Sequence, residues 1–522
     1  MNLPAWREAI ESGDPNRMQA ARRALEDLIR SQPTAFEPLD AEAQVLHALG
    51  EDALAERLLD EFLLYDPGST AAAIRLAWLR HVSGRRDDAV AEILATLGRD
   101  PSSLQARIYA IQWLVEEGQA QRAEQIGTEG LEIHGDNGSL LLWLGLAQAA
   151  SGHTDKAVST LARAHEVDPG NEEIARDYAR ILLSVRRPAD AFAVLEPFGL
   201  GPEPSPKTWL TAARAAHAAR LPRKGSWFLH RLATDPRCDS DQLQHDVIKA
   251  ASECLGGTSA ENWAFSLIET GVAVDALGVE LLESCAAQMN RTKVEHVFVS
   301  ASRAPGRYQR TIARFLTTFS ELTTTHGVVA KWVAANGHEI QLHTPIWAGV
   351  GAWHLARRKY AEAVDHLTHW PGRRGVKPWM ILLLGRALEA LGRHSEANAQ
   401  YRAALQLPPD HSEPALRTRL GFNLALEGLA ANGHLIITDL STKGTQYVSA
   451  EDRARSAAIE GLFAIECADS PDDARNSRNE ALELITELRQ GEAASVVSQI
   501  ERLYIRRADE MIEDPRTFAR NR

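Results

Sequence analysis

The chain has 522 residues, which is too long for one ordinary globular core, and its 44% hydrophobic and 24% charged residues exclude wholesale disorder. A formal net charge of −13 argues against broad binding to nucleic acid or to anionic membranes, which requires clustered Lys and Arg. We expect a cytoplasmic protein without membrane insertion, because the four cysteines are scattered, no apolar run is long enough to cross a membrane and no secretory leader is visible. The Arg- and Ala-rich composition suggests a bacterial source.

Small residues recur along the N-terminal part of the chain at a step of 34 residues. Alanine stands at this step at Ala21, Ala55, Ala89, Ala123, Ala157 and Ala191. Between these alanines, glycine recurs at Gly50, Gly84, Gly118 and Gly152. Small side chains let two helices pack closely, and glycine adopts the left-handed conformation that ends a helix. The period therefore predicts a series of helix pairs.

One stretch carries the pattern in full. It runs from Leu141 to Pro169 and includes Leu144, Gly145, Gly152, Ala157, Leu161 and Ala164. This stretch resembles the tetratricopeptide repeat. The resemblance implies a right-handed superhelix of helix pairs, with a concave groove that binds peptide segments of partner proteins. We therefore expect an all-α, right-handed α-solenoid of such repeats, with a degenerate middle and a C-terminal helical cap.

In chain order, the pattern divides the sequence into four parts. Residues 1–238 are predicted to form about seven repeats, of which six keep a regular register and the seventh, at 206–238, is looser. Residues 239–343 are expected to be degenerate helix pairs at 239–272, 273–309 and 310–343, the last with its turn at His326–Gly327. Residues 344–411 restore the pattern as two repeats, since Ala363 and Ala397 are again 34 residues apart.

The fourth part, residues 412–522, is expected to be a helical cap that shields the last apolar face of the array. Helices are predicted near 413–430, 451–467, 472–489 and 492–513. Residues 434–439, His-Leu-Ile-Ile-Thr-Asp, are expected to form a short strand or an irregular loop.

The resemblance also implies which first-helix positions face the groove. In the earlier repeats these positions are mostly apolar: Ile74, Trp78, Ile108, Gln112, Leu142 and Leu146. In the later repeats they are basic: Arg176, Arg180, Lys207 and Arg214. Arginine pairs bidentately with carboxylates, so we hypothesise that this stretch binds an acidic or C-terminal carboxylate segment of a partner. The alternative is that the arginines pair with neighbouring acids such as Glu173 and Asp177.

Motifs for chemistry are absent from the sequence: there is no phosphate loop, no H-E-x-x-H and no G-x-S-x-G, and we expect no catalytic residue, metal or cofactor. His366 and His369 lie one helical turn apart and could approach one metal, but a structural role is the better interpretation because further ligands are lacking. Four tryptophans in the second repeat block are expected to be mainly core: Trp347, Trp353, Trp370 and Trp379.

The leading interpretation is a protein–protein interaction scaffold. A ligand- or peptide-responsive regulator is the alternative, and it predicts a small, pre-formed concave pocket. An enzyme or enzyme accessory subunit is less favoured, because no convergent set of catalytic residues is visible. The sequence leaves the partner's identity and the oligomeric state open.

Overall fold

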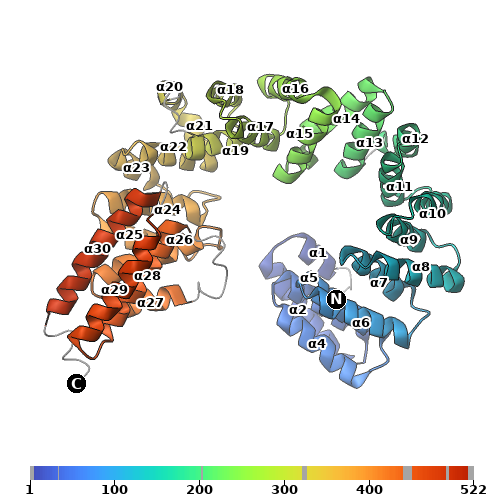
Figure 1. Ribbon diagram of the computed structural model, residues 1–522, viewed down its shortest axis with the longest axis horizontal. Helices are drawn as coiled ribbons and strands as arrows, with labels where there is room; N and C mark the ends of the chain where they lie inside the picture. The colour runs from blue at the N-terminus through green and yellow to red at the C-terminus, as the bar shows by residue number, and fades with distance from the viewer. Residues whose placement is uncertain are drawn as a thin grey trace. The chain divides into compact units, whose positions relative to one another are not determined.

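The computed structural model describes residues 5–32, 34–201, 204–319, 326–438, 449–489 and 493–514. Throughout these ranges the regular structure is helical, with no strand, so the all-α repeat fold is confirmed (Figure 1). The chain divides into two compact units. We call Met1–Leu232 with Glu253–Gly256 the N-terminal unit, and Ala233–Ser252 with Gly257–Arg522 the C-terminal unit. The finer division into four parts remains a prediction.

The N-terminal unit is built from consecutive helical hairpins. Its helices are α1 (Ala5–Glu11), α2 (Pro15–Ser31), α3 (Phe36–Ala48), α4 (Asp52–Tyr65), α5 (Thr70–Val82), α6 (Arg86–Arg99), α7 (Leu104–Glu116), α8 (Ala120–His134), α9 (Gly138–Ala150), α10 (Thr154–Val167), α11 (Glu172–Ser184), α12 (Pro188–Gly199), α13 (Pro206–Ala218) and α14 (Pro222–Thr234). Most first helices pack against their own second helix and against the first helix of the next hairpin, as α7 does with α8 and α9.

Both ends of these helices follow the 34-residue step. The predicted turn glycines all have positive φ, for example 78° at Gly50 and 84° at Gly84, which ends each first helix in the left-handed conformation. Each next first helix is capped by a side-chain oxygen that accepts a backbone N–H. These caps are also 34 residues apart: Ser69, Ser103, Asn137, Asn171 and Ser205. The repeat therefore determines where each helix begins and ends, as well as how the helices pack.

Within a hairpin, a glycine on the first helix meets a large side chain on the second. A Cβ built on Gly145 would lie 2.6 Å from Cγ of Leu161, and one built on Gly385 would overlap the ring of Tyr401. Both pairs are 16 residues apart in sequence. The small positions of the pattern are therefore needed because the facing side chain occupies the space of their missing Cβ.

The C-terminal unit continues the same construction. Its helices are α15 (Asp241–Leu255), α16 (Gly257–Glu269), α17 (Asp275–Ala287), α18 (Arg291–Ala301), α19 (Gln309–Arg314), which continues as the π-helix η2 (Phe315–Phe319), α20 (His326–Ala335), α21 (Gly337–Leu342), α22 (Thr344–Ala356), α23 (Tyr360–Leu367), α24 (Pro378–Ala390), α25 (His394–Ala404), α26 (Glu413–Leu426), α27 (Ala430–Ile437), α28 (Ala450–Glu466), α29 (Pro471–Glu487) and α30 (Ala494–Glu513). A short 3-10 helix, η1 (Pro236–Cys238), precedes α15.

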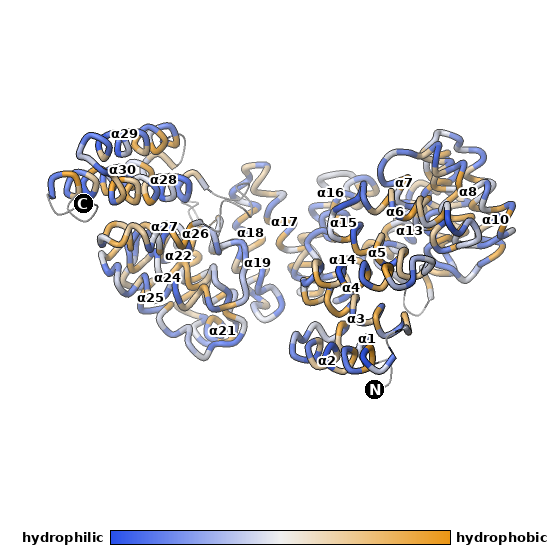
Figure 2. The backbone as a smooth tube through the Cα atoms, turned by 90° about the horizontal axis from the view of Figure 1, so that it is seen from below, coloured by the Kyte–Doolittle hydropathy of each residue, from blue (hydrophilic) through white to orange (hydrophobic). Residues whose placement is uncertain are grey.

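First helices again form a continuous row, in which α17, α19, α22, α24, α26, α28 and α30 each pack on the next. Along their length the helical tubes change between hydrophobic and hydrophilic, as expected of helices that bury one face (Figure 2). No helix among the described residues is both long and apolar enough to span a membrane.

Two local expectations were wrong. Residues 434–437, expected in a strand or loop, form the end of α27, the second helix of a hairpin with α26; Asp439 lies outside the described residues. Gly433 lets α27 pack closely, since a Cβ there would lie 2.5 Å from the carbonyl oxygen of Gly421. His326 and Gly327 do not form the turn of a hairpin but begin α20.

The expectation for the tryptophans is confirmed. Trp347 and Trp353 are buried in the core of the C-terminal unit, and Trp370 and Trp379 are half-buried against the same core. The indole N–H of Trp347 donates to the carbonyl oxygen of His366 at 3.1 Å. These rings fill the space between helix pairs, where large aromatic side chains bury the most apolar surface.

Candidate binding site

The apolar groove positions expected in the N-terminal unit divide into two groups. Ile74 and Leu142 are buried, with 6% and 3% of their surface exposed, so they contribute to the core and offer a partner little surface. Four others keep more exposed surface: Trp78, Ile108, Gln112 and Leu146. Gln112 uses its amide to donate to Glu116 on its own helix at 3.0 Å.

Acidic partners accompany three of the four basic groove residues. Arg176 lies 3.3 Å from Asp177, and Arg180 lies 3.1 Å from the same carboxylate. Arg214 pairs with Glu253 at 3.2 Å. Lys207 is exposed and forms no ion pair with a described residue. The arginines thus make the neighbouring pairs of the alternative interpretation, and recognition of an acidic partner segment here stays a prediction.

The two histidines considered as metal ligands bond to backbone. Nε2 of His366 lies 2.9 Å from the carbonyl oxygen of Trp347, and Nδ1 of His369 lies 3.1 Å from that of Asp365. Burial lowers the pKa of His366, with its neighbours Arg373 and His369 acting in the same direction. Within the described ranges no three His, Cys, Asp or Glu side chains are grouped to hold a metal ion. These contacts support a structural role.

A cavity of about 210 Å³ opens in the C-terminal unit along the row of first helices. Its polar wall comes from Arg386 and Glu389 of α24, Arg419 and Asn423 of α26, and Glu451 and Arg455 of α28. On each helix the two residues are three or four positions apart, so their side chains share one face. Helix α30, which packs on α28, also lines the cavity, with Gln499 and three apolar residues, Val496, Ile500 and Leu503.

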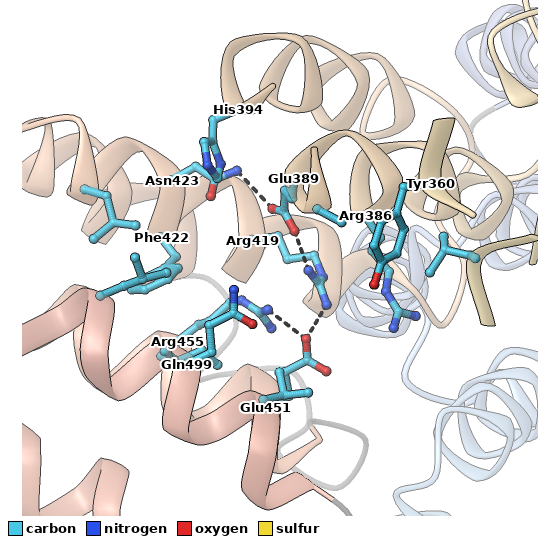
Figure 3. A pocket seen from close by; sticks show the side chains of 16 residues that line it. Tyr360, Arg386, Glu389, His394, Arg419, Phe422, Asn423, Glu451, Arg455 and Gln499 are labelled. Atoms are coloured by element: carbon cyan, nitrogen blue, oxygen red, sulfur yellow. Dashed lines mark hydrogen bonds and ion pairs between the residues drawn. The ribbon is translucent and has the colours of Figure 1, made fainter. Parts of the chain in front are cut away.

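Four of these side chains form an alternating chain of charges, which we call the arginine–glutamate chain: Glu389, Arg419, Glu451 and Arg455. Nη1 of Arg419 lies 2.6 Å from Glu389, and Arg419 also pairs closely with Glu451. Nη2 of Arg455 lies 2.7 Å from Glu451. Both arginines are only 6% exposed. Figure 3 shows Arg419 between the two carboxylates.

Neighbouring groups hold this chain in place. The amide of Asn423 donates to Glu389 and to Asn398, in each case at 3.0 Å. Asp452 lies behind Arg455 at 3.7 Å and accepts a hydrogen bond from Thr418 at 3.1 Å. Charges that are paired and hydrogen-bonded on several sides have little freedom to rearrange, so the cavity is pre-formed.

Two members of this chain, Glu451 and Arg419, are shifted toward their charged forms. Burial alone would raise the pKa of Glu451, but Arg419 and Arg455 outweigh it and hold this pKa at about 2. Burial likewise opposes the charge of Arg419, yet Glu389 and Glu451 raise the pKa of its guanidinium. A removed partner would leave a buried charge uncompensated, which makes such chains sensitive to substitution.

Arg386 differs from the other two arginines of the cavity. Its side chain is exposed, and none of the described residues forms a hydrogen bond or ion pair with it. In Figure 3 no dashed line joins its guanidinium to Glu389 or to Glu451. Desolvation by the cavity walls and the charge of Arg419 lower the pKa of Arg386, and the more distant charges of Glu451 and Glu389 only partly oppose them. The cavity therefore presents one unpaired guanidinium, which is suited to binding an anion.

The sequence did not reveal this cavity, since its lining residues lie between Leu355 and Leu503 on separate helices and form no motif. One pattern could have pointed to it. Gly385 and Gly392 are followed by Gly421 and Gly428 at a step of 36 rather than 34, and this step continues the repeat through α26 and α27. Once that hairpin is recognised, the arginines on α24, α26 and α28 all belong to first helices.

Comparison with known proteins supports the repeat assignment. Residues 380–411, which span most of α24 and all of α25, match the family model described as tetratricopeptide repeat. Cellulose synthase operon protein C of Komagataeibacter xylinus is 29% identical over 136 residues, which are 26% of this chain and 10% of that protein. The protein of the same name from Komagataeibacter sucrofermentans is 28% identical over 127 residues, 24% of this chain and 10% of that protein. The chain thus spans about a tenth of these relatives' length.

Among solved structures, a tetratricopeptide repeat protein from Parabacteroides merdae is 15% identical, with a TM-score of 0.35. That similarity covers 44% of this chain and 91% of the other. A thermophilic protein of the same kind from Thermus thermophilus is 23% identical with a TM-score of 0.30, covering 36% of this chain and all of the other.

Proposed function

We propose that the chain is an interaction scaffold and that a partner segment binds along the first helices of the C-terminal unit. The proposal starts from the tetratricopeptide-repeat fold, which generally serves protein–protein interaction. One observation carries this proposal: Arg386 is an exposed guanidinium without an acidic partner among the described residues, in a pre-formed cavity. An acidic group of the partner would complete the pairing that the chain itself leaves open.

We further propose that the scaffold acts without catalysis, binds no nucleic acid and works in the cytoplasm of a bacterium. The cysteines support a reducing compartment, because Cys285 is buried in the apolar core of the C-terminal unit and forms no disulfide. The net charge of −13 supports protein rather than nucleic-acid partners.

Affinity capture from the extract of the source cells, read by mass spectrometry, tests the proposal. The wild-type chain is compared with Arg386→Gln and with Arg402→Gln, a matched control on α25 that is also exposed and unpaired among the described residues. We expect a stoichiometric partner that Arg402→Gln retains and Arg386→Gln loses. Circular dichroism would confirm that both variants remain helical. Retention of the partner by Arg386→Gln, or equal loss from both variants, would contradict this site.

A ligand-responsive regulator is the second candidate function. The observation that favours it is the cavity itself, which is small at about 210 Å³ and whose polar wall is held by paired charges. If no protein is captured, and small anions stabilise the wild-type chain but not Arg386→Gln in a thermal shift assay, this second function replaces the first.

A further inference from the structure

The charges in the cavity define what kind of anion fits it. Arg419 and Arg455 are already paired with Glu389, Glu451 and Asp452, which leaves the guanidinium of Arg386 as the unpaired positive charge among the described groups. The carboxylates of Glu389 and Glu451 keep 15% and 23% of their surface exposed at the cavity wall. A second negative charge on a ligand would meet these carboxylates, so a singly charged anion is favoured over phosphate or an acidic stretch.

Outside the polar wall, and apart from Tyr360, His394 and Gln499, the remaining side chains that line the cavity are apolar. The apolar lining includes two residues of α26, Phe422 and Leu426, and three of α30, Val496, Ile500 and Leu503. Leu503 is 36% exposed, so part of its apolar surface is available to a ligand. Burying an apolar group against these walls is favourable at about 25 cal/mol per Å².

The volume limits the size of this group. An apolar protein cavity of about 150 Å³ holds one benzene molecule. At about 210 Å³, the present cavity accommodates a single ring or branched alkyl group together with a carboxylate. It is too small for a helix or an extended segment of several residues.

From these three properties we infer that the cavity binds a small monocarboxylate, with its carboxylate on Arg386 and its apolar body between α26 and α30. This inference rests on the proposed function, because the acid would occupy the position offered to the partner. Two sources supply such a group, a free carboxylic acid and the terminal residue of a peptide, and both present the same chemistry.

Isothermal titration calorimetry on the full chain tests the inference with phenylacetate and isovalerate as free acids. A hexapeptide that ends in leucine with a free carboxylate represents the second source. Phenylacetamide removes the charge, and inorganic phosphate and triglutamate add charge. We expect at least one monocarboxylate probe to bind. Phenylacetamide should bind at least about tenfold more weakly than phenylacetate, because it loses the charge-assisted hydrogen bond to the guanidinium. Binding of the hexapeptide alone would identify the peptide as the source.

Variants separate the two halves of the site. Arg386→Gln should weaken binding of the best probe about tenfold or more, and Arg402→Gln should leave it unchanged. Leu503→Gln should weaken binding without removing the preference for the acid over its amide. Because Leu503 is partly exposed, this variant should fold normally.

Three results would overturn the inference: phenylacetamide binds as well as phenylacetate, phosphate or triglutamate binds more tightly, or no probe binds. These results are distinguishable from failure of the proposed function. If no probe binds but Arg386→Gln still loses a captured protein, the scaffold function stands and the small-acid site does not.

Discussion

Replacing Glu451 by glutamine removes one carboxylate from the arginine–glutamate chain while keeping its size. The pKa of this carboxyl is about 2, against an ordinary value of 4.5, because Arg419 and Arg455 outweigh the effect of burial. At about 1.4 kcal/mol per pKa unit, this difference corresponds to about 3 kcal/mol of stability at neutral pH. Glu451→Gln should therefore destabilise the C-terminal unit by about 3 kcal/mol at neutral pH.

The pH dependence makes this prediction specific. A carboxyl whose pKa is depressed on folding contributes its full stability above the unfolded value of 4.5, and loses it as the pH falls toward about 2. The gap between wild type and Glu451→Gln should thus be constant above pH 4.5 and close progressively below it. Urea unfolding followed by circular dichroism measures the gap, and hydrogen exchange in α28 localises it.

Glu396 supplies the control, since its pairing with Arg393 lies on the surface, with the Glu396 side chain 55% exposed. Glu396→Gln should change stability little at any pH, because exposed ion pairs contribute little. A gap of less than about 1 kcal/mol for Glu451→Gln, or one that persists undiminished to the lowest pH, would refute the charge balance assigned to the chain.

Three further outcomes are expected. Gly385→Ala should destabilise the C-terminal unit by about 1–3 kcal/mol in urea unfolding, because its Cβ would overlap the ring of Tyr401; unchanged stability would contradict that packing. Arg358→Gly should stabilise it by about 0.5–1 kcal/mol, since Arg358 holds φ at 57°, and a loss of stability would argue against strain there. Burial and His366 lower the pKa of His354 to about 4, so NMR should show it neutral down to that pH. The stability that neutral His354 contributes is complete above pH 6.5 and declines as the pH falls toward 4, because the unfolded chain takes up a proton there. His354→Gln should remove this decline, and titration of His354 near pH 6.5 would contradict its burial.

The sequence predicted the repeats best where backbone requirements recur. Gly50 and Gly84 stand where the chain needs a positive φ, and Gly145 stands where Leu161 leaves no room for a Cβ. The same turn position holds Arg186 and Arg220, which adopt φ of 58° and 60° without being glycine. Tertiary packing imposes the turn at these positions, so a search for glycine alone misses turns that the structure contains.

Prediction failed where the spacing changed. Between α24 and α26 the step lengthens from 34 to 36 residues, and Ile436 and Ile437 have the high strand propensity that suggested a strand or loop. Packing of Gly433 against Gly421 overrides that local preference and makes this segment the second helix of a hairpin. Without the hairpin, α26 could not be recognised as a first helix, and Arg419 could not be placed beside Glu389.

The unpaired guanidinium of Arg386 results from a competition between two arginines for one carboxylate, which the local sequence does not reveal. In the N-terminal unit, Arg176 pairs with Glu173 and Asp177, and Arg180 pairs with Asp177, all on their own helix. Arg386 has an equivalent acid three positions away, Glu389, which by the same rule should pair with it. Glu389 instead accepts from Arg419 at 2.6 Å and from Asn423, both on α26. Because a neighbouring helix takes the carboxylate that Arg386 would otherwise use, the guanidinium remains open to an anion from outside the chain.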